Sequence, residues 1–162
     1  MKTQYDIYLA GPFFSDEQKK HCADVRAIFE SVGLTVCDPQ ELNPVIKDLP
    51  ESERGPKLFK RIFEGNVEGL ERSWAYIFLT DDKDTGTSWE FGYAFKASHV
   101  RNKGPLITLS FTGKPANVML AQAAHLHYAS FDDLKTSINT LAEVIRSRKH
   151  VIAGPHQNRA DE

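Results

Sequence analysis

Residues 74–97 read WAYIFLTDDKDTGTSWEFGYAFKA, and this stretch decides the fold class. The run from Trp74 to Thr80 is apolar and rich in aromatic and aliphatic residues, which predicts a fully buried strand. Asp81 to Gly86 reads as a polar turn, and Ser88 to Ala97 as a helix with Glu90 in its first turn. A buried strand that leads through a short turn into a helix is the repeating unit of α/β proteins.

The same alternation continues in both directions along the chain. Further strands are predicted at 6–10, 34–37, 105–110 and 126–129, and helices at 58–70, from about 117, and at 131–147. After the first strand, Ser15 and Gln18 form a capping-box pattern, which predicts a helix that ends near Gly33. Residues 38–57 are polar and read as a long loop, a kind of connection that is often functional.

The order of these elements predicts one domain, residues 1–149, followed by a flexible tail at 150–162. Strands that alternate with helices form βαβ units, so we expect an α/β fold with a doubly wound, mostly parallel sheet and helices on both faces, flavodoxin-like or Rossmann-like. Ligands of such sheets bind at the carboxyl ends of the strands. The loops after Ala10, Cys37 and Thr80 are therefore the candidate binding loops.

Composition narrows the choice of partner. The 162 residues carry a net charge of −2, which argues against a nucleic-acid polymer and favours a small molecule. No stretch approaches the roughly 20 apolar residues of a membrane span. Cys22 and Cys37 are too few for a disulfide framework, so we expect them to be reduced and the protein to be cytoplasmic.

Two of the candidate loops carry residues suited to chemistry. Phe13 and Phe14 follow the first strand, either as core beneath the loop or as a platform for a flat ligand such as a base. Asp84 and Glu90 are two carboxylates that a turn can bring into one pocket, where different surroundings suit them to different roles. We also expected the helix dipole to favour the Glu90 anion. The alternative is a solvated acidic turn with Glu90 as a capping residue.

Cofactor sites find little support in the sequence. No G-x-G-x-x-G motif follows the first strand, which weighs against a dinucleotide site. His125 and His127 share one face of a predicted strand, but no third ligand of a suitable kind is nearby, so we expect no metal.

Three separated stretches resemble the nucleoside 2-deoxyribosyltransferases, especially the branch found in lactobacilli. They are IYLAGPFFSDEQ at 7–18, DTGTSWEFGYA at 84–94 and GKPANVM at 113–119. Their order and spacing are similar to those of the family over residues 7–119, whereas the tail beyond about Ser147 is not. The resemblance implies transfer of a deoxyribose between nucleobases, with deoxynucleosides and free bases as substrates and no cofactor.

The resemblance also assigns roles within the pocket. Glu90 matches the family's nucleophile, which Tyr8 orients through a hydrogen bond. Asp84 matches a residue that handles the base or its proton, and Phe13 matches an aromatic that stacks on the base. Gln40 is a base-edge contact in a stretch where the alignment is loose.

Two further residues match positions that serve a neighbouring subunit. Asn117 and Met119 correspond to residues that reach into a partner's site, where the Asn binds the 5′-hydroxyl of the sugar. The resemblance therefore implies a homo-oligomer with shared active sites. The alternative for this segment is that Asn117 caps its helix and Met119 is core.

One position departs from the family's pattern. Asn66 stands where the family often has Asp, and an amide cannot donate an acidic proton. Either Asp84 alone handles protonation, or Glu64 or Glu68 substitutes, or substrate choice has shifted. If Asn66 has replaced an acid, Asn66→Asp is expected to leave activity intact or raise it.

Two other functions compete with transfer. A nucleoside or nucleotide N-glycoside hydrolase needs similar residues, and for monophosphates it also needs phosphate-binding groups near the first loop, where Ser15 is available but no Arg is. A Rossmann-like binding module is the third possibility, although it has no evident use for Tyr8, Asp84 and Glu90.

Overall fold

A five-stranded parallel sheet with the strand order β2-β1-β3-β4-β5 lies at the centre of the molecule. The computed structural model describes residues 4–43, 46, 49–114 and 117–152. The strands are β1 (Tyr5–Ala10), β2 (Val36–Cys37), β3 (Ser73–Leu79), β4 (Leu106–Leu109) and β5 (Leu126–Tyr128). The helices are α1 (Asp16–Ser31), α2 (Pro39–Leu42), η2 (Glu51–Glu53), α3 (Pro56–Arg72), α4 (Thr85–Val100), α5 (Val118–Ala123) and α6 (Phe131–Ile152).

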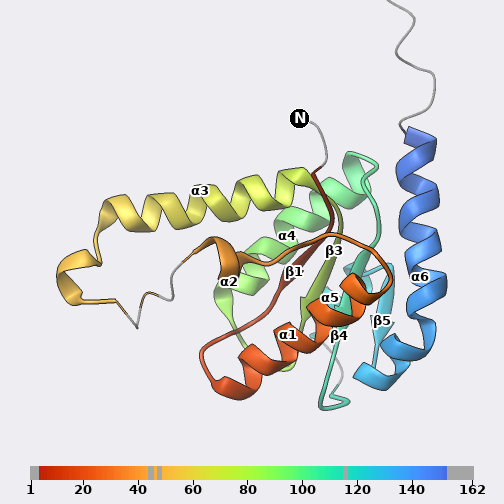
Figure 1. Ribbon diagram of the computed structural model, residues 1–162, viewed down its shortest axis with the longest axis horizontal. Helices are drawn as coiled ribbons and strands as arrows, with labels where there is room; N and C mark the ends of the chain where they lie inside the picture. The colour runs from red at the N-terminus through yellow and green to blue at the C-terminus, as the bar shows by residue number, and fades with distance from the viewer. Residues whose placement is uncertain (1–3, 44–45, 47–48, 115–116, 153–162) are drawn as a thin grey trace, which may run out of the picture.

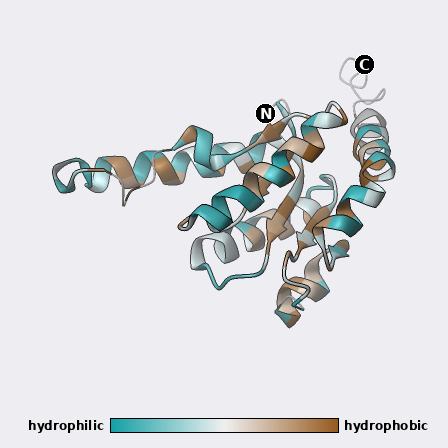
Figure 2. Ribbon diagram, turned by 60° about the horizontal axis from the view of Figure 1, so that its bottom comes forward, coloured by the Kyte–Doolittle hydropathy of each residue, from teal (hydrophilic) through white to brown (hydrophobic). Residues whose placement is uncertain are grey.

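Helices cover both faces of the sheet (Figure 1). One buried cluster joins the strands to α1 through Val25 and Phe29 and to α6 through Leu134. The other joins them to α3 through Leu70 and to α4 through Phe91, with α5 packed at its edge. Figure 2 shows the apolar ribbon concentrated in the strands between these layers. The predicted doubly wound fold is therefore confirmed, with the flavodoxin-like strand order.

Local signals in the sequence explain most element boundaries. The Ser15 hydroxyl accepts a hydrogen bond from the backbone N–H of Gln18, whose side chain accepts one from the N–H of Ser15, so the predicted capping box is present. Gly33 follows α1 with φ of 74°, a left-handed conformation that glycine adopts without strain. Each predicted strand is present, and the observed bounds are within two residues of those predicted.

Three predicted boundaries were wrong. The stretch 38–57 is not one loop, because Asp38 caps α2 and Pro39 starts it, and α3 already begins at Pro56. Helix α4 begins at Thr85, so Glu90 lies in its second turn rather than its first. Helix α6 continues to Ile152, so the first residues of the expected tail are helical, and 153–162 lie outside the described residues.

The amino-terminal half of α3 extends far from the sheet. Together with η2 it forms an arm, residues 51–63, that projects from the body of the molecule (Figure 1). Phe59 and Phe63 on this arm are 48% and 54% exposed. Among the residues that the structure describes, no helix is long and apolar enough to cross a membrane.

Candidate active site

Glu90 is the point at which three elements converge. The Tyr8 hydroxyl, from β1, donates a hydrogen bond to Oε1 of Glu90 at 3.1 Å. The Asn66 amide, from α3, donates to the same oxygen at 2.8 Å. Both donors act on Oε1, and no described residue donates to the other carboxylate oxygen, which can therefore face a ligand.

Tyr8 is held beneath the site and not on its surface. Its side chain is fully buried, and it packs against α3 at Gly69, where a Cβ would lie 3.0 Å from the Tyr8 ring. Burial, and then the negative charge of Glu90, raise the pKa of Tyr8 well above its ordinary range. Tyr8 therefore stays protonated and acts as a hydrogen-bond donor.

The pKa of Glu90 is itself raised to about 7, from 4.5, chiefly by burial. The hydrogen bonds from Tyr8 and Asn66 lower this pKa, and the charge of Asp84 raises it. The expected helix-dipole effect is not the dominant influence, because Glu90 lies one turn too far along α4. Near neutral pH, Glu90 can therefore exist in either protonation state.

Asp84 occupies the capping position that the alternative interpretation gave to Glu90. Its carboxylate accepts hydrogen bonds from the backbone N–H of Thr87 at 2.7 Å and from the Thr87 hydroxyl at 2.6 Å. Asp84 also lines the cavity that contains Glu90. The turn thus brings both carboxylates into one pocket, with Asp84 anchored as the cap of α4.

Asn66 belongs to a chain of amides that ends on Glu90. The Asn43 amide donates to Oδ1 of Asn66 at 2.8 Å, which directs the Asn66 NH₂ group toward Glu90. The position where the family often has an acid is therefore used here as a donor to the carboxylate. Glu64 and Glu68, the possible substitutes, are exposed and do not line the cavity.

The cavity has a volume of about 530 Å³ and lies at the carboxyl ends of β1, β2 and β3. Its apolar wall includes Leu9, Phe13, Phe14, Ile46 and Ile62, and its polar wall includes Asp38, Gln40, Asn43, Asn66, Asp84 and Glu90. Such a crevice opens between β1 and β3, because the chain continues from β1 to β2 on one side of the sheet and from β3 to β4 on the other. The predicted site residues Phe13, Gln40, Asn66, Asp84 and Glu90 all meet there.

Gln18 holds the aromatic part of this wall in place. Its side-chain oxygen accepts hydrogen bonds from the backbone N–H groups of Phe14 and Ser15, and its NH₂ group donates to Asp82 at 2.8 Å. The rings of Phe13 and Phe14 stack with their centroids 5.5 Å apart. The loop after β1 is thereby tied to the turn that carries Asp84.

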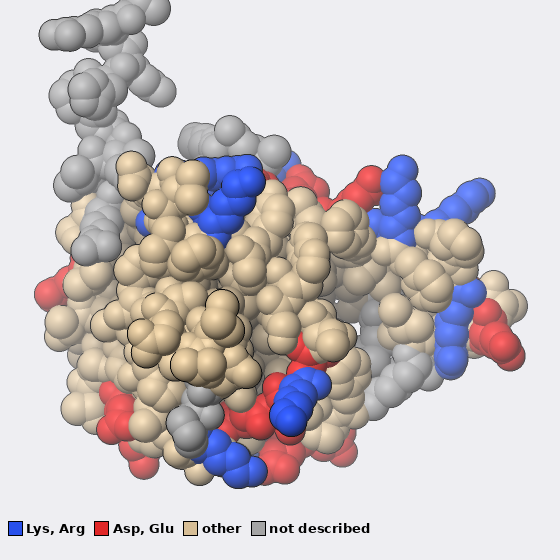
Figure 3. Space-filling model, turned by 180° about the vertical axis from the view of Figure 1, so that it is seen from behind, with Lys and Arg blue, Asp and Glu red and all other residues tan. Residues whose placement is uncertain are grey.

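A second hollow, of about 410 Å³, shares Glu90 and Asn66 with the first. It lies at the base of the arm and is lined by exposed aromatic side chains, with the rings of Phe63 and Trp89 5.3 Å apart. Seen from behind, the molecule has a broad face with few charged side chains (Figure 3). Glu90 is thus reached from the cavity on one side and from an apolar groove on the other.

Asn117 and Met119 do not line this chain's own cavity. Asn117 caps α5, since its side-chain oxygen accepts a hydrogen bond from the N–H of Met119 at 2.9 Å. Met119 is 74% exposed and Val118 is 67% exposed, so the alternative that Met119 is core is wrong. The segment presents apolar side chains away from its own subunit.

His125, directly before β5, and His127, within β5, have other partners. Nδ1 of His125 accepts a hydrogen bond from the N–H of Leu106 at 3.1 Å, and His127 pairs with the Thr108 hydroxyl at 2.9 Å. Among the described residues, no group of three His, Cys, Asp or Glu side chains could hold a metal ion.

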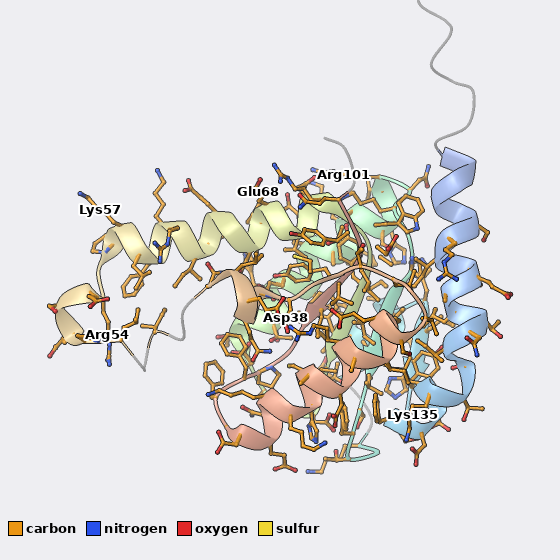
Figure 4. All side chains as sticks on the ribbon, in the orientation of Figure 1. Asp38, Arg54, Lys57, Glu68, Arg101 and Lys135 are labelled. Carbon is orange, nitrogen blue, oxygen red and sulfur yellow. The ribbon has the colours of Figure 1, made fainter. Side chains whose placement is uncertain are left out.

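Sequence reasoning gave no role to four polar residues of the cavity: Asp38, Asn43, Arg54 and Thr87. Asp38 carried a usable signal, because an Asp-Pro pair directly after a strand is a helix start at the binding edge of the sheet. Arg54 comes from the arm, whose path no local pattern reveals, and Figure 4 shows it on the arm, to the left of the labelled Asp38.

A parallel α/β sheet with a carboxylate-centred pocket at its β1–β3 crevice defines a small-molecule enzyme of the doubly wound class. Within that class, the chain belongs to the nucleoside 2-deoxyribosyltransferase family, whose model matches residues 7–125. None of the curated proteins matches the sequence.

Solved structures agree with this fold, and the first of them also agrees with the family. The 2-deoxyribosyltransferase of the psychrotolerant bacterium Bacillus psychrosaccharolyticus is 28% identical, with a TM-score of 0.68 over 83% of this chain and 94% of that one. A 2-desoxiribosyltransferase from Leishmania mexicana is 22% identical, with a TM-score of 0.55 over 88% of this chain and 98% of that one. The TIR domain of a Toll-related receptor from Hydra magnipapillata is 15% identical, with a TM-score of 0.57 over 88% and 99%, and shares the fold alone.

Proposed function

We propose that this chain transfers 2-deoxyribose between nucleobases through a covalent intermediate on Glu90. The observation that carries the proposal is the Glu90 carboxylate, which lines the cavity and is held on one oxygen by Tyr8 and Asn66. The family membership and the similarity to the Bacillus enzyme support the reaction class. We also propose that the chain belongs to the lactobacillus branch of the family, and this part of the proposal rests on the sequence motifs alone.

The reaction proceeds in two displacements at the anomeric carbon. The free oxygen of Glu90 bonds to C1′ as the bond from C1′ to the base nitrogen breaks, and the electron pair of that bond leaves with the base, which takes up a proton or hydrogen bond. A second base then attacks C1′ and releases Glu90. Two inversions give net retention of configuration.

Asp84 is the acidic residue that we assign to the base. Its carboxylate lies on the cavity wall, fixed by Thr87, where it can accept a hydrogen bond from the departing base or exchange its proton. Phe13 offers a ring for stacking, and Gln40 offers an amide to the edge of the base.

We also propose that the active site is shared in a homo-oligomer. Transfer instead of hydrolysis requires that water be kept from the intermediate until the second base arrives. The groove between the arm and Trp89 leaves Glu90 open on one side, and the exposed Asn117, Val118 and Met119 have no role in their own subunit's cavity. A partner's α5 would supply a ligand for the sugar hydroxyl and an apolar cover. We place the activity in nucleoside salvage in the cytoplasm, where the buried Cys22 and Cys37 would remain reduced.

Incubation of deoxyinosine with adenine, and separately with guanine, tests the proposal. A new deoxynucleoside indicates transfer, free deoxyribose alone indicates an N-glycoside hydrolase, and no reaction favours a binding module. Mass spectrometry of enzyme quenched with deoxyinosine alone should find a deoxyribosyl adduct on Glu90. Near-normal transfer by a folded Glu90→Ala variant would contradict the mechanism.

A further inference from the structure

Asp38, the cap of α2, is a buried carboxylate on the cavity wall to which no role toward a ligand has been given. It follows β2, lies near the centre of the molecule (Figure 4), and is only 6% exposed. Within the described part of the chain, Asp38 forms no ion pair, and the nearby Arg26 pairs with Glu30 and Glu41. A buried carboxylate without a cationic partner is costly unless hydrogen-bond donors surround it.

Among the described residues, Gln40 supplies the hydrogen bonds that Asp38 receives. Its Oδ1 accepts a hydrogen bond from the backbone N–H of Gln40 at 2.9 Å, and the side chain of Gln40 also interacts with the carboxylate. A carboxylate can accept about four hydrogen bonds. Asp38 lines the cavity and burial raises its pKa, so a ligand with donor groups would relieve the cost of burial.

The position of Asp38 relative to Glu90 indicates which part of a nucleoside it meets. Both residues line the same cavity, and Tyr8, which donates a hydrogen bond to Glu90, pairs in the sheet with Cys37, the residue before Asp38. With the sugar at Glu90 and the base against Phe13, the wall formed by Asp38 and Gln40 faces the edge of the base.

We propose that Asp38 reads the hydrogen-bonding edge of the base and selects 6-oxopurines, guanine above all. The inference rests on the proposed function and adds the substrate class to it. Guanine presents two adjacent donors, N1–H and the 2-amino group, which match the acceptors of a carboxylate. Hypoxanthine presents N1–H alone. Adenine and cytosine place a lone pair beside their amino group, and uracil flanks its N3–H with two carbonyl oxygens, so each of these sets an acceptor against Asp38.

Asp38→Asn tests this assignment without removing the cap of α2. Asn is as good an N-cap as Asp, so its oxygen keeps the hydrogen bond from the N–H of Gln40. The cavity then meets an NH₂ donor in place of an oxygen, which opposes N1–H of guanine and suits N1 of adenine. Asp132→Asn, at an exposed position in the first turn of α6, is the matched control.

The measurement is release of the free base in single turnover, with enzyme in excess over deoxyguanosine, deoxyinosine or deoxyadenosine. We expect the wild type to prefer them in that order. Asp38→Asn should lower the rate constant for deoxyguanosine relative to deoxyadenosine by about 30- to 100-fold, the scale of one or two hydrogen bonds to a charged group. Asp132→Asn should keep the wild-type order. An equal loss for all three nucleosides, or a wild type that prefers deoxyadenosine, would overturn the assignment.

Failure of the proposed function is distinguishable from failure of this inference. If the wild type releases no base from any deoxynucleoside, the proposed function fails, and calorimetry with the Glu90→Ala protein still tests Asp38. In that background, tighter binding of deoxyguanosine than of deoxyadenosine, reversed by Asp38→Asn, supports the base-edge role. Equal binding of the two nucleosides contradicts it.

Discussion

At the scale of single residues, the protonation of Glu90 governs the chemistry that we propose. A carboxylate must be ionised to attack C1′, yet burial raises the pKa of Glu90 to about 7. Tyr8 and Asn66 oppose this effect, because their hydrogen bonds favour the ionised form. Burial makes the Glu90 anion more reactive but also less stable. The hydrogen bonds from Tyr8 and Asn66 stabilise the anion, so a useful fraction of Glu90 stays ionised near neutral pH.

The first prediction is a pH profile. We expect kcat/KM for base release to fall about tenfold per pH unit below a pKa near 7, because only ionised Glu90 reacts. Tyr8→Phe should move this limb to higher pH, since it removes a donor that stabilises the anion. A profile that is flat between about pH 5 and 8 would show that Glu90 is not the group that titrates.

The same pKa predicts how stability depends on pH. The pKa of Glu90 is higher in the folded protein than its ordinary 4.5, so the folded state binds more protons between the two values, and the contribution of Glu90 to stability is lost as pH rises from about 4.5 to 7. Glu90→Gln removes this loss and keeps an acceptor for Tyr8 and Asn66. Urea unfolding should find the variant more stable than the wild type by about 1–3 kcal/mol at pH 8 and equal to it at pH 4. Equal differences at both pH values would contradict the assigned pKa.

The geometry of Asn66 leads to a different expectation for Asn66→Asp from the one that the sequence favoured. Asn66 donates to Glu90 at 2.8 Å, so an Asp there replaces a donor with a second carboxyl group. Two carboxylates at that distance resist joint ionisation. We expect the acid limb of kcat/KM to move upward by at least one pH unit, with activity at pH 7 reduced about tenfold. An unchanged limb would show that Asn66 does not control the charge of Glu90.

At the scale of elements, the start of α4 combines structure with chemistry. Asp84 ends the turn after β3, caps the helix through Thr87 and lines the cavity. The helix therefore cannot begin without fixing this carboxylate in the pocket. Gln18 adds a second restraint, because it ties the loop after β1 to Asp82 in the same turn.

Two substitutions of Asp84 separate the cap from the catalytic role. Asp84→Asn preserves capping, so we expect unchanged thermal stability and a loss of about 100-fold or more in kcat, the usual scale for a positioned proton handler. Asp84→Ala should lose the same activity and also about 0.5–2 kcal/mol of stability. An Asp84→Asn enzyme with an unchanged rate across the pH range would assign Asp84 to capping alone.

At the scale of the whole molecule, the exposed apolar side chains lie where a partner would complete the site. The arm presents Phe59 and Phe63 beside Trp89, and α5 presents Val118 and Met119. The groove at the base of the arm opens directly onto Glu90. A surface of this kind is typical of an interface between subunits.

Complementation tests whether subunits share their sites. Glu90→Ala and Asn117→Ala proteins, each nearly inactive alone, are mixed and allowed to exchange subunits. A mixed dimer then holds one site with both defects and one with neither, so activity should return. A wild type that is an active monomer by light scattering, or a mixture with demonstrated exchange and no activity, would exclude sharing. Exchange is monitored with a fluorescent label on one of the two proteins.

Local patterns determined the elements of this fold and their caps. The strand from Trp74, the capping box of Ser15 and Gln18, and the turn at Gly33 depend on residues within a few positions of one another, so the sequence predicts them directly. The site residues Tyr8, Phe13, Asp84 and Glu90 could also be predicted from local sequence, because each lies in a short motif.

Only the tertiary structure revealed how the residues of the site are hydrogen-bonded to one another. The chain from Asn43 through Asn66 to Glu90, and the place of Asp38 on the cavity wall, depend on the strand order and on where α2 and α3 pack. The pKa of Glu90 is likewise a property of packing, because it reflects how completely distant parts of the chain exclude water from one carboxylate. Desolvation sums over neighbours in space, and a linear sequence does not say which residues those neighbours are.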